Sequence, residues 1–321
     1  MKAIVQDRYG PADRLRLTDV ETPTPGTGQV LVEVRAAGVD PGIWHVMTGL
    51  PYAVRLGYGL RRPRHRVPGM DLAGVVTAVG PGVTTFTRGD EVYGTGTGSF
   101  AEYAVAPAGR LAPKPAGPTF AEAAAVPISG QTALTAVRDA ARVRPGHRVL
   151  VIGAGGGVGS YAVQLARAAG AHVTGLCGPT KLDLVRALGA HDVVDYTRHD
   201  LPDQRYDVVI DTAGNRPLSR LRRIIPPKGT LVLVGGEARD GRWLQGFDRQ
   251  LRALALSPFV GQRLVPLVAT QSTANLAALT EHIEAGQVRP VVERTFPLTE
   301  AAAAIRHVKA GHTSGKVVIA S

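Results

Sequence analysis

The stretch from His147 to Gly170 has the composition and spacing of a loop that binds a dinucleotide. An apolar run, HRVLVIG, leads into several glycines, and an amphipathic pattern typical of a helix starts among them. In the Gly-x-Gly-x-x-Gly register, Ala154 takes the first position, and Gly156 and Gly159 take the others. Gly156 would let the backbone approach a pyrophosphate closely, and Gly159 would let the helix pack tightly on the sheet.

The first residues of this helix would complete the phosphate site. Amides at a helix N-terminus lack intrahelical partners and carry the positive end of the helix dipole, so those of Gly157 and Val158 would face the phosphates. The alternative is a glycine-rich turn without a ligand. The strand before the glycines and the helix after them favour the dinucleotide site.

The end of the next strand indicates which dinucleotide binds. A site that prefers NAD usually places a carboxylate there to hold the ribose 2′-hydroxyl. Here HVTGL runs into CGPTK, and the first carboxylate is Asp183, already within the following helix. Thr180 and Lys181 suit the charged 2′-phosphate of NADPH instead, with Lys181 as a flexible point charge. The alternative for Lys181 is a solvated lysine in the first turn of that helix.

Composition excludes several classes of protein. The single Cys177 excludes an internal disulfide and a zinc site of several cysteines. The net charge is +11, but the arginines are scattered and no recognised nucleic-acid motif accompanies them, so we expect no specific nucleic-acid partner. A basic enzyme with anionic ligands explains the charge more plainly. We expect a cytoplasmic protein, because we find neither a signal-peptide pattern nor an apolar run long enough to span a membrane.

These residues must be positioned by two domains, which suits a chain of 321 residues. Short apolar runs between Pro and Gly turns predict a β-barrel or partly open sheet in the first third. From Thr119, a candidate N-cap with Glu122 three residues on, helical and strand patterns alternate, which predicts a doubly wound parallel α/β sheet. The helix–strand–helix–strand pattern near the C-terminus could extend that sheet or return to the first domain.

The order of the segments resembles the zinc-free quinone oxidoreductase branch of the medium-chain dehydrogenase/reductase family. The resemblance covers nearly the whole chain and rests on GVDPGIWHVMTG, PGMDLAGVVTAVGPGVTTFTRGDEVYG, ISGQTALTAV, VLVIGAGGGVGSYAVQLARAAGA, YDVVIDTAG, GTLVLVGG and GHTSGKVVI. It implies a GroES-like β-barrel domain over residues 1–124 and 268–321 and a Rossmann domain over 125–267, with NADPH bound at their junction. It also implies a homodimer joined through edge strands around Phe259 to Val268.

The same resemblance assigns roles to individual residues. Lys181 and Tyr196 match the pair that contacts the 2′-phosphate, although Tyr196 could equally be a partly exposed residue at a strand end. Thr132 matches the threonine near the nicotinamide, and Gly235 falls in a cofactor-binding segment. Asp40 stands where zinc-dependent relatives have a catalytic cysteine.

No metal is expected in this chain. The His-Glu pair of the zinc-dependent relatives reads Gly69-Met70-Asp71, and the structural zinc lobe is missing. Aspartates alone make a poor zinc site.

Without a metal, the chemistry favours quinones and enones, which accept hydride and spread the resulting charge over a conjugated oxygen. We hypothesise that His45 donates the proton and that Asp40 orients His45; alternatively, both residues serve only the structure of their loop. The expected function is therefore an NADPH-dependent quinone or enone reductase. An NADPH-binding sensor and a reductase of a biosynthetic, carrier-bound enoyl intermediate are the alternatives.

A basic segment at residues 51–69 would lie beside the substrate. It carries Arg55, Arg61, Arg62, Arg64 and Arg66. Either it favours an anionic or carrier-bound substrate, or it is a solvated basic loop.

Overall fold

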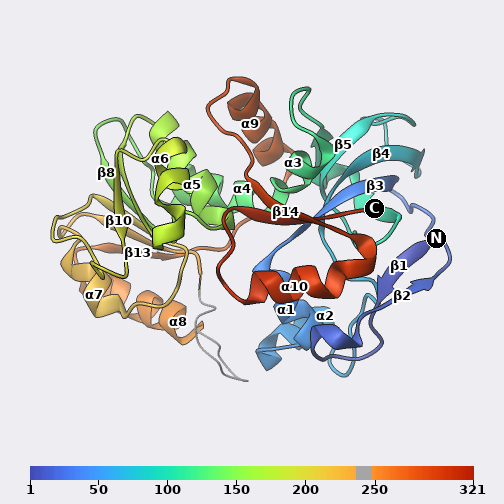
Figure 1. Cartoon of the computed structure of the whole chain (residues 1–321), viewed down its shortest axis with the longest axis horizontal. Coiled ribbons are helices and arrows are strands. Elements are labelled where there is room, and N and C mark those ends of the chain that lie inside the picture. Colours follow the sequence, from blue (N-terminus) through green and yellow to red (C-terminus); the bar gives the residue numbers. More distant parts are fainter. Residues whose placement is uncertain (236–246) are drawn as a thin grey trace. The chain divides into compact units, whose positions relative to one another are not determined.

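The chain divides into two compact units (Figure 1). The computed structural model describes residues 1–235 and 247–321. One unit comprises residues 1–131 and 271–321, and the other residues 132–270. The first limit falls inside helix α4 (Pro127–Leu134), which the sequence analysis placed wholly in the second domain. The prediction of a β-rich domain combined with a doubly wound α/β domain is confirmed.

The first unit is built on a seven-stranded mixed sheet and a separate two-stranded one. The larger sheet has the order β14-β15-β3-β4-β5-β7, with β6 also paired to β3, and β1 pairs with β2. The strands are β1 (Lys2–Val5), β2 (Arg16–Asp19), β3 (Gln29–Val39), β4 (Asp71–Val79), β5 (Glu91–Thr95), β6 (Tyr103–Pro107), β7 (Leu111–Pro113), β14 (Val292–Pro297) and β15 (Lys316–Ala320).

Strand β3 shows why these residues form a sheet with a buried face. Val30, Val32 and Val34 alternate with partly exposed residues and are at most 2% exposed, as the period of two in a strand requires. β-branched side chains suit such a pleated surface. The valines belong to one apolar core with residues of β4, β5 and β15.

The C-terminal segment returns to the first unit, which settles the question that the sequence left open. Strand β15 pairs antiparallel with β3, with Val317 opposite Val39. Helix α10 (Ala301–Lys309) contacts α1 (Pro41–Thr48), although the two are far apart in the sequence (Figure 1). The ammonium of Lys309 lies 4.0 Å from the centre of the Trp44 ring at this contact.

The remaining helices of this unit have between four and twelve residues. They are α2 (Arg55–Tyr58), α3 (Phe120–Ala124), the first part of α4 and α9 (Thr273–Glu284). The predicted N-cap at Thr119 is confirmed: its hydroxyl accepts from the Glu122 amide, and the Glu122 carboxylate accepts from the Thr119 amide.

The second unit contains a six-stranded parallel sheet of order β10-β9-β8-β11-β12-β13. Its strands are β8 (Arg148–Ile152), β9 (His172–Cys177), β10 (Asp192–Asp195), β11 (Val208–Asp211), β12 (Thr230–Leu233) and β13 (Arg263–Pro266). Its helices are α5 (Gly157–Ala168), α6 (Leu182–Ala187), α7 (Leu218–Arg223) and α8 (Phe247–Leu256), preceded by a π-helix (Thr135–Ala140).

The order of these strands fixes where a ligand can bind. On one side of β8 lie β9 and then β10. On its other side lie β11, β12 and β13. In such sheets, ligands bind outside the carboxyl ends of the strands at the point where the order reverses. That point lies between β8 and β11.

Candidate functional site

The glycine loop follows β8 at this reversal point and leaves no room for larger residues at two positions. Gly153 has φ of +80°, and a Cβ there would lie 2.5 Å from Oγ1 of Thr212. A Cβ on Gly159 would lie 2.1 Å from the carbonyl oxygen of Gly153. The first turn of helix α5 therefore packs closely against the loop, and this close packing requires glycine at position 159.

The first turn of α5 presents amides to whatever binds outside the loop. Gly156 is the N-cap, and the first i to i+4 hydrogen bond runs from the Ser160 amide to its carbonyl at 2.9 Å. The amides of Gly157, Val158 and Gly159 precede that bond and so have no carbonyl one turn before them. A Cβ on Gly156 would lie 3.4 Å from the carbonyl oxygen of Gly153, which is ordinary van der Waals contact. Ala154, by contrast, is fully buried.

Lys181 and Tyr196 follow the ends of the neighbouring strands β9 and β10. Lys181 ends a short 3-10 turn after β9, and a Cβ on Gly155 would lie 2.7 Å from its Cδ, so the aliphatic stem of Lys181 lies over the loop. The Tyr196 hydroxyl lies 3.2 Å from the Cβ position of Gly178, and Tyr196 is 45% exposed. Thr180 is exposed beside Lys181. Lys181 thus lies against the glycine loop, and Tyr196 lies against Gly178, three residues before Lys181.

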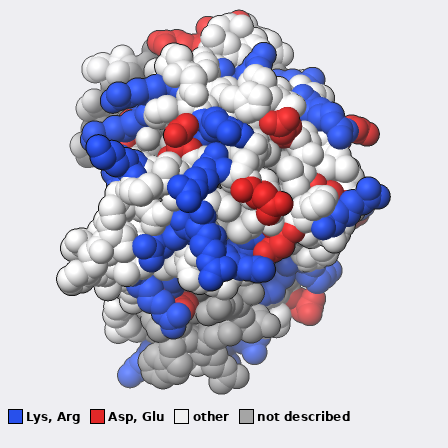
Figure 2. All heavy atoms as spheres, turned by 90° about the vertical axis from the view of Figure 1, so that its left-hand side faces the viewer, with Lys and Arg blue, Asp and Glu red and all other residues white. Residues whose placement is uncertain are grey.

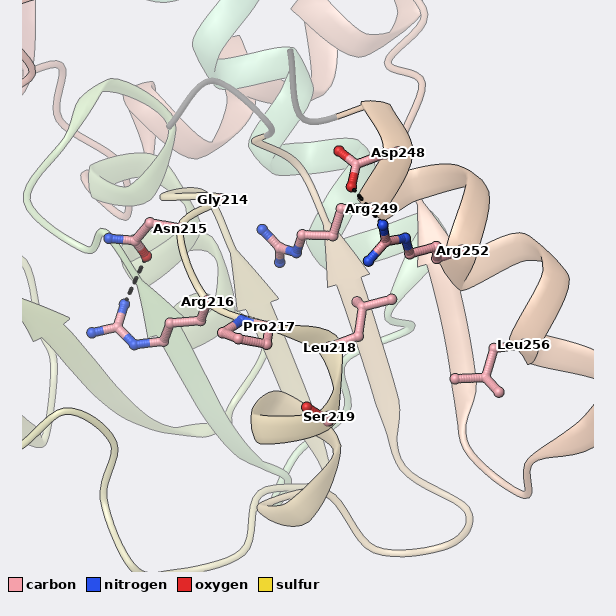
Figure 3. Close-up of a pocket in the computed structure, with 10 residues that line it drawn as sticks. All are labelled: Gly214, Asn215, Arg216, Pro217, Leu218, Ser219, Asp248, Arg249, Arg252 and Leu256. Atoms are coloured by element: carbon pink, nitrogen blue, oxygen red, sulfur yellow. Dashed lines mark hydrogen bonds and ion pairs between the residues drawn. The ribbon is translucent and has the colours of Figure 1, made fainter. Parts of the chain in front are cut away.

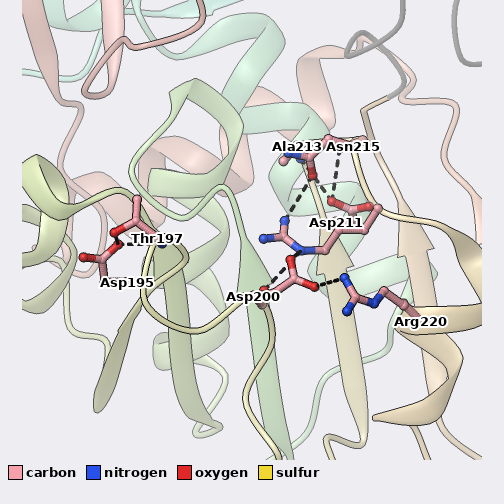
Figure 4. A network of polar contacts seen from close by, with 9 residues as sticks. Asp195, Thr197, Asp200, Asp211, Ala213, Asn215 and Arg220 are labelled. Atoms are coloured by element: carbon pink, nitrogen blue, oxygen red, sulfur yellow. Dashed lines mark hydrogen bonds and ion pairs between the residues drawn. The ribbon is translucent and has the colours of Figure 1, made fainter.

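The acidic residue at the end of the neighbouring strand β10 is engaged elsewhere. Asp195 ends β10, and its Oδ1 accepts from the amide and hydroxyl of Thr197 at 2.9 and 2.8 Å (Figure 4). These hydrogen bonds hold the pKa of Asp195 below its ordinary value. Its carboxylate serves its own turn rather than the end of β9.

Thr212 joins the carboxyl ends of three strands and was missed by the sequence analysis. Its hydroxyl donates to the carbonyl of Ile152 at 2.7 Å, which links β11 to β8. A Cβ on Gly235 would lie 2.4 Å from the Thr212 carbonyl oxygen, so the end of β12 packs against the same backbone. The only signal for this role of Thr212 is the sequence DTAG at the end of β11. That sequence does not reveal the close approach of Gly235.

In the first unit, Asp40 belongs to a buried cluster of charges. Its Oδ1 accepts from the Ser129 hydroxyl at 2.9 Å and from the Lys316 ammonium. The Lys316 nitrogen also lies 3.6 Å from Oδ2 of Asp71. The Asp71 carboxyl accepts from the Ile128 amide at 3.0 Å. Sequence analysis predicted none of these partners.

Two carboxyl groups face one ammonium in this cluster, and burial forces them to titrate differently. Burial disfavours the charge of Asp40, yet the Lys316 ammonium lowers its pKa. Burial and the neighbouring Asp40 raise the pKa of Asp71 well above its ordinary value. The ammonium therefore favours the ionised form of Asp40, whereas burial and the neighbouring Asp40 favour the neutral form of Asp71.

His45 is positioned by the backbone and not by Asp40. Its Nδ1 lies 2.8 Å from the carbonyl oxygen of Leu50, which can only accept, so Nδ1 carries a proton and Nε2 is the nitrogen that gains or releases one. Within the described chain, the Asp40 side chain bonds to Ser129 and Lys316. The hypothesis that Asp40 orients His45 is therefore wrong.

The third residue assigned to catalysis, Thr132, lies in α4 and is half-buried. It follows Ser129 by three positions, so both side chains lie on one face of the helix. This places a hydroxyl of the buried charge cluster and the predicted nicotinamide contact on the same short helix.

Cys177 has no role as a nucleophile. It is 2% exposed at the end of β9, and burial raises the pKa of its thiol to about 11. A thiol with this pKa is protonated at neutral pH and is a poor nucleophile and a poor metal ligand.

The basic segment divides into structural and exposed arginines. The guanidinium of Arg55 lies 4.6 Å from the centre of the Tyr9 ring and 4.8 Å from that of Tyr52, and Arg66 pairs with Asp7. Arg61, Arg62, Arg64 and Arg66 are exposed. Arg55 thus holds the loop, Arg66 joins it to Asp7 at the surface, and the other three carry charge to the surface.

Positive charge also covers much of the face shown in Figure 2, with acidic side chains among it. In the second unit, Arg186 pairs with Asp183, and Arg220 pairs with Asp200. Such pairing reduces the field that a nucleic-acid surface would need. No helix among residues 1–235 and 247–321 is both long and apolar enough to cross a membrane.

Models of two protein families match the chain. The alcohol dehydrogenase GroES-like domain matches residues 26–116, and a family described as zinc-binding dehydrogenase matches residues 188–319.

Individual proteins are similar over nearly all of this chain. Quinone oxidoreductase of Rattus norvegicus is 32% identical over 329 residues, which cover 99% of this chain and 96% of the rat protein. A mycobacterial protein, solved in complex with NADPH, superimposes with a TM-score of 0.84 at 26% identity and covers 100% of both chains. The pikromycin polyketide synthase component PikAII of Streptomyces venezuelae is 35% identical over 318 residues, which cover 94% of this chain and 8% of that protein.

Proposed function

The chain is an oxidoreductase of the quinone oxidoreductase-like branch of the medium-chain dehydrogenase/reductase superfamily, and from this premise we propose that it reduces quinones or α,β-unsaturated carbonyls with NADPH and without a metal. The observation that carries the proposal is that Lys181 lies over the glycine loop while the Tyr196 hydroxyl lies against Gly178, three residues before Lys181, because a cation and a hydroxyl at this end of β9 suit a 2′-phosphate. NADPH, when bound, supplies the hydride.

The residues present fit NADPH at the edge of the parallel sheet. The amides of Gly157, Val158 and Gly159 suit the pyrophosphate, and the positive end of the α5 dipole adds to their attraction. Lys181 supplies a cation and Tyr196 a hydroxyl for the 2′-phosphate, with Thr180 beside them. Asp195 is turned into its own loop, so no carboxylate opposes that phosphate from the end of β9.

The residues at the position of the relatives' zinc favour a reaction without metal. Asp40 and Asp71 flank the Lys316 ammonium, so an internal cation already balances the charge of the pair. Met70 stands where an imidazole would be needed, and a thioether is a poor ligand for zinc. Conjugated acceptors tolerate this because their developing charge needs only hydrogen bonds and one proton.

We assign the proton transfer to His45. Its Nδ1 is held by the Leu50 carbonyl, which leaves Nε2 as the nitrogen that would deliver a proton. Ser129 and Lys316 hold Asp40 away from this task.

Oxidation of NADPH and NADH by the purified, EDTA-treated protein tests the proposal, with benzoquinone, phenanthrenequinone and 2-alkenals as acceptors. We expect turnover with NADPH that EDTA leaves unchanged. Binding of NADPH without turnover on this panel would contradict the proposal and favour an NADPH sensor.

A second candidate is a reductase of a carrier-bound enoyl intermediate. The similarity to the polyketide synthase component favours it, and the exposed Arg61, Arg62 and Arg64 would attract an anionic carrier. Turnover confined to enoyl thioesters of an acyl carrier protein would identify this function.

Replacing Lys181 with Ala is expected to reduce kcat/KM for NADPH about 10- to 100-fold and to leave that for NADH nearly unchanged, because a hydrogen bond to a charged group contributes about 1.5–3 kcal/mol. Steady-state kinetics with both cofactors measure the effect. Arg186→Ala, which removes an exposed cation from the adjacent helix α6, is the matched control. An equal loss with NADH would show that Lys181 does not recognise the 2′-phosphate.

The exposed edge of the parallel sheet supports a homodimer. Strand β13 is one of the two edge strands of this sheet, and Phe259 and Val268 beside it are 85% and 86% exposed. Large exposed apolar groups of this kind mark interaction surfaces. We expect Phe259→Asp to convert a dimer into a monomer in analytical ultracentrifugation, and Leu56→Asp, at an exposed leucine of the first unit, to leave the dimer intact. A wild-type monomer would rule out the dimer.

A further inference from the structure

The second unit contains a pocket that the proposed cofactor site does not use. It lies between the loop after β11, the start of α7 and helix α8, and its volume is about 290 Å³ (Figure 3). None of the glycine-loop residues lines it. Ligand pockets usually range from roughly 300 to 1,000 Å³, so this one suits a small ligand and not a second dinucleotide.

Arg249, on α8, brings an incompletely paired guanidinium to this pocket. Its side chain is 10% exposed, and its Nη2 pairs with Oδ2 of Asp211. Its Nε and Nη1 are buried and find no hydrogen-bond partner in the part of the chain that the structure describes. Leaving such donors unpaired is costly, more so for a charged group, so a ligand oxygen here would be stabilised.

Asp211 cannot satisfy the remaining nitrogens. Its Oδ1 already accepts from the amides of Ala213 and Gly214 at 3.2 and 3.1 Å (Figure 4). Asp211 therefore holds only the Nη2 of Arg249. The Nε and Nη1 of the guanidinium could bind an acceptor other than Asp211.

The other charged groups around the pocket show which sign of ligand it takes. Arg216 is held by Asp200 at 3.1 Å and by the side-chain oxygen of Asn215 at 3.0 Å. Arg252 is 74% exposed and lies 3.5 Å from Asp248, so it contributes a mobile cation at the surface. Pro217, Leu218 and Leu256 form an apolar part of the lining.

We propose that this pocket binds a small organic carboxylate, with the oxygens on Arg249 and a short apolar chain against Leu218 and Leu256. A carboxylate pairs well with a planar guanidinium, and the leucines favour a ligand with a hydrocarbon part over a bare inorganic anion. The site is separate from the glycine loop and needs no bound NADPH.

Titration of the full-length protein with butyrate, followed by saturation-transfer NMR, tests the proposal. We expect saturable binding that Arg249→Lys weakens at least tenfold, since lysine keeps a cation beside Asp211 but loses the additional donors. Arg252→Gln, at an exposed position that folding does not need, is expected to weaken binding severalfold. Arg223→Gln is the matched control, an exposed arginine of α7 outside the lining.

Three results would overturn the proposal. The first is an absence of saturable butyrate binding, or binding that neither Arg249→Lys nor Arg252→Gln weakens. The second is phosphate binding as tight as butyrate, which would show an unspecific anion site. The third is displacement of butyrate by NADPH in direct competition, which would assign the pocket to the cofactor.

Discussion

Lys316→Met is expected to destabilise the first unit by about 3–5 kcal/mol, the usual effect of removing one partner from a buried ion pair. Lys316 is 2% exposed, and its loss leaves the Asp40 charge without a counter-ion inside the core. Urea denaturation, together with hydrogen exchange of peptides from β3 and β15, measures the effect. The exchange data localise it, because β15 pairs with β3.

Two further variants separate burial from charge. Lys2→Met removes a lysine from an ion pair with Asp19 in the same unit, but there the side chains are 52% and 72% exposed, so we expect a far smaller loss of stability than for Lys316→Met. Adding Asp40→Asn to Lys316→Met removes the uncompensated charge and is expected to recover part of the lost stability. Equal effects of Lys316→Met and Lys2→Met would contradict the account of a buried cluster.

The pKa directions in this cluster also predict how stability changes with pH. Because the folded pKa of Asp71 is raised above 3.8, its contribution is fully present below that pH and is lost as pH rises through the folded pKa. The pKa of Asp40 is lowered, so its contribution is present above 3.8 and is lost as pH falls through its folded pKa. Asp71→Asn, which cannot ionise, should therefore remove the alkaline loss and keep the acidic one.

His45→Ala is expected to lower kcat about 100-fold or more with the best acceptor, because a positioned general acid contributes about 10²–10⁴-fold. The fall in kcat at alkaline pH that a histidine proton donor imposes should disappear with it. Rates of NADPH oxidation over a range of pH measure both effects.

The control for this variant is His65→Ala, which removes an exposed histidine from the nearby basic segment and should leave kcat and its pH profile unchanged. Melting temperatures of both variants show whether folding is intact. A His45→Ala protein with the wild-type pH profile would exclude His45 as the proton donor, whatever its kcat.

Local signals predicted much of the fold. The strand, glycines and helix from Arg148 to Ala168 were predicted from adjacent residues, and so was the capping box at Thr119. Strands β2, β6, β7 and β13 were missed, since each has at most five residues and is held by pairing with strands elsewhere in the chain. Helix α1 was missed because Pro41 and Gly42 read as a loop, although proline is well suited to the first turn of a helix.

The sequence predicts the cofactor site, but it does not predict the charge cluster. Lys181 and Gly155 lie on consecutive strand–helix connections, so the spacing of a βαβ unit brings them together. Asp40 meets Ser129 and Lys316 across separations of 89 and 276 residues. No spacing rule covers such distances, and a lysine beside the apolar run VVIA reads as the exposed start of a strand.

Lys316 lies in the last strand of the chain, and this has a consequence for protein synthesis on the ribosome. Residues 1–131 contain both acids of the cluster, but their counter-ion is translated only after the whole of residues 132–270. At about 5–20 residues per second, roughly ten seconds or more separate the two events. During that interval Asp40 and Asp71 must remain hydrated, and β3 keeps an unpaired edge. The second unit (residues 132–270) can therefore finish folding before the first unit, although the first unit is the one whose translation begins earlier.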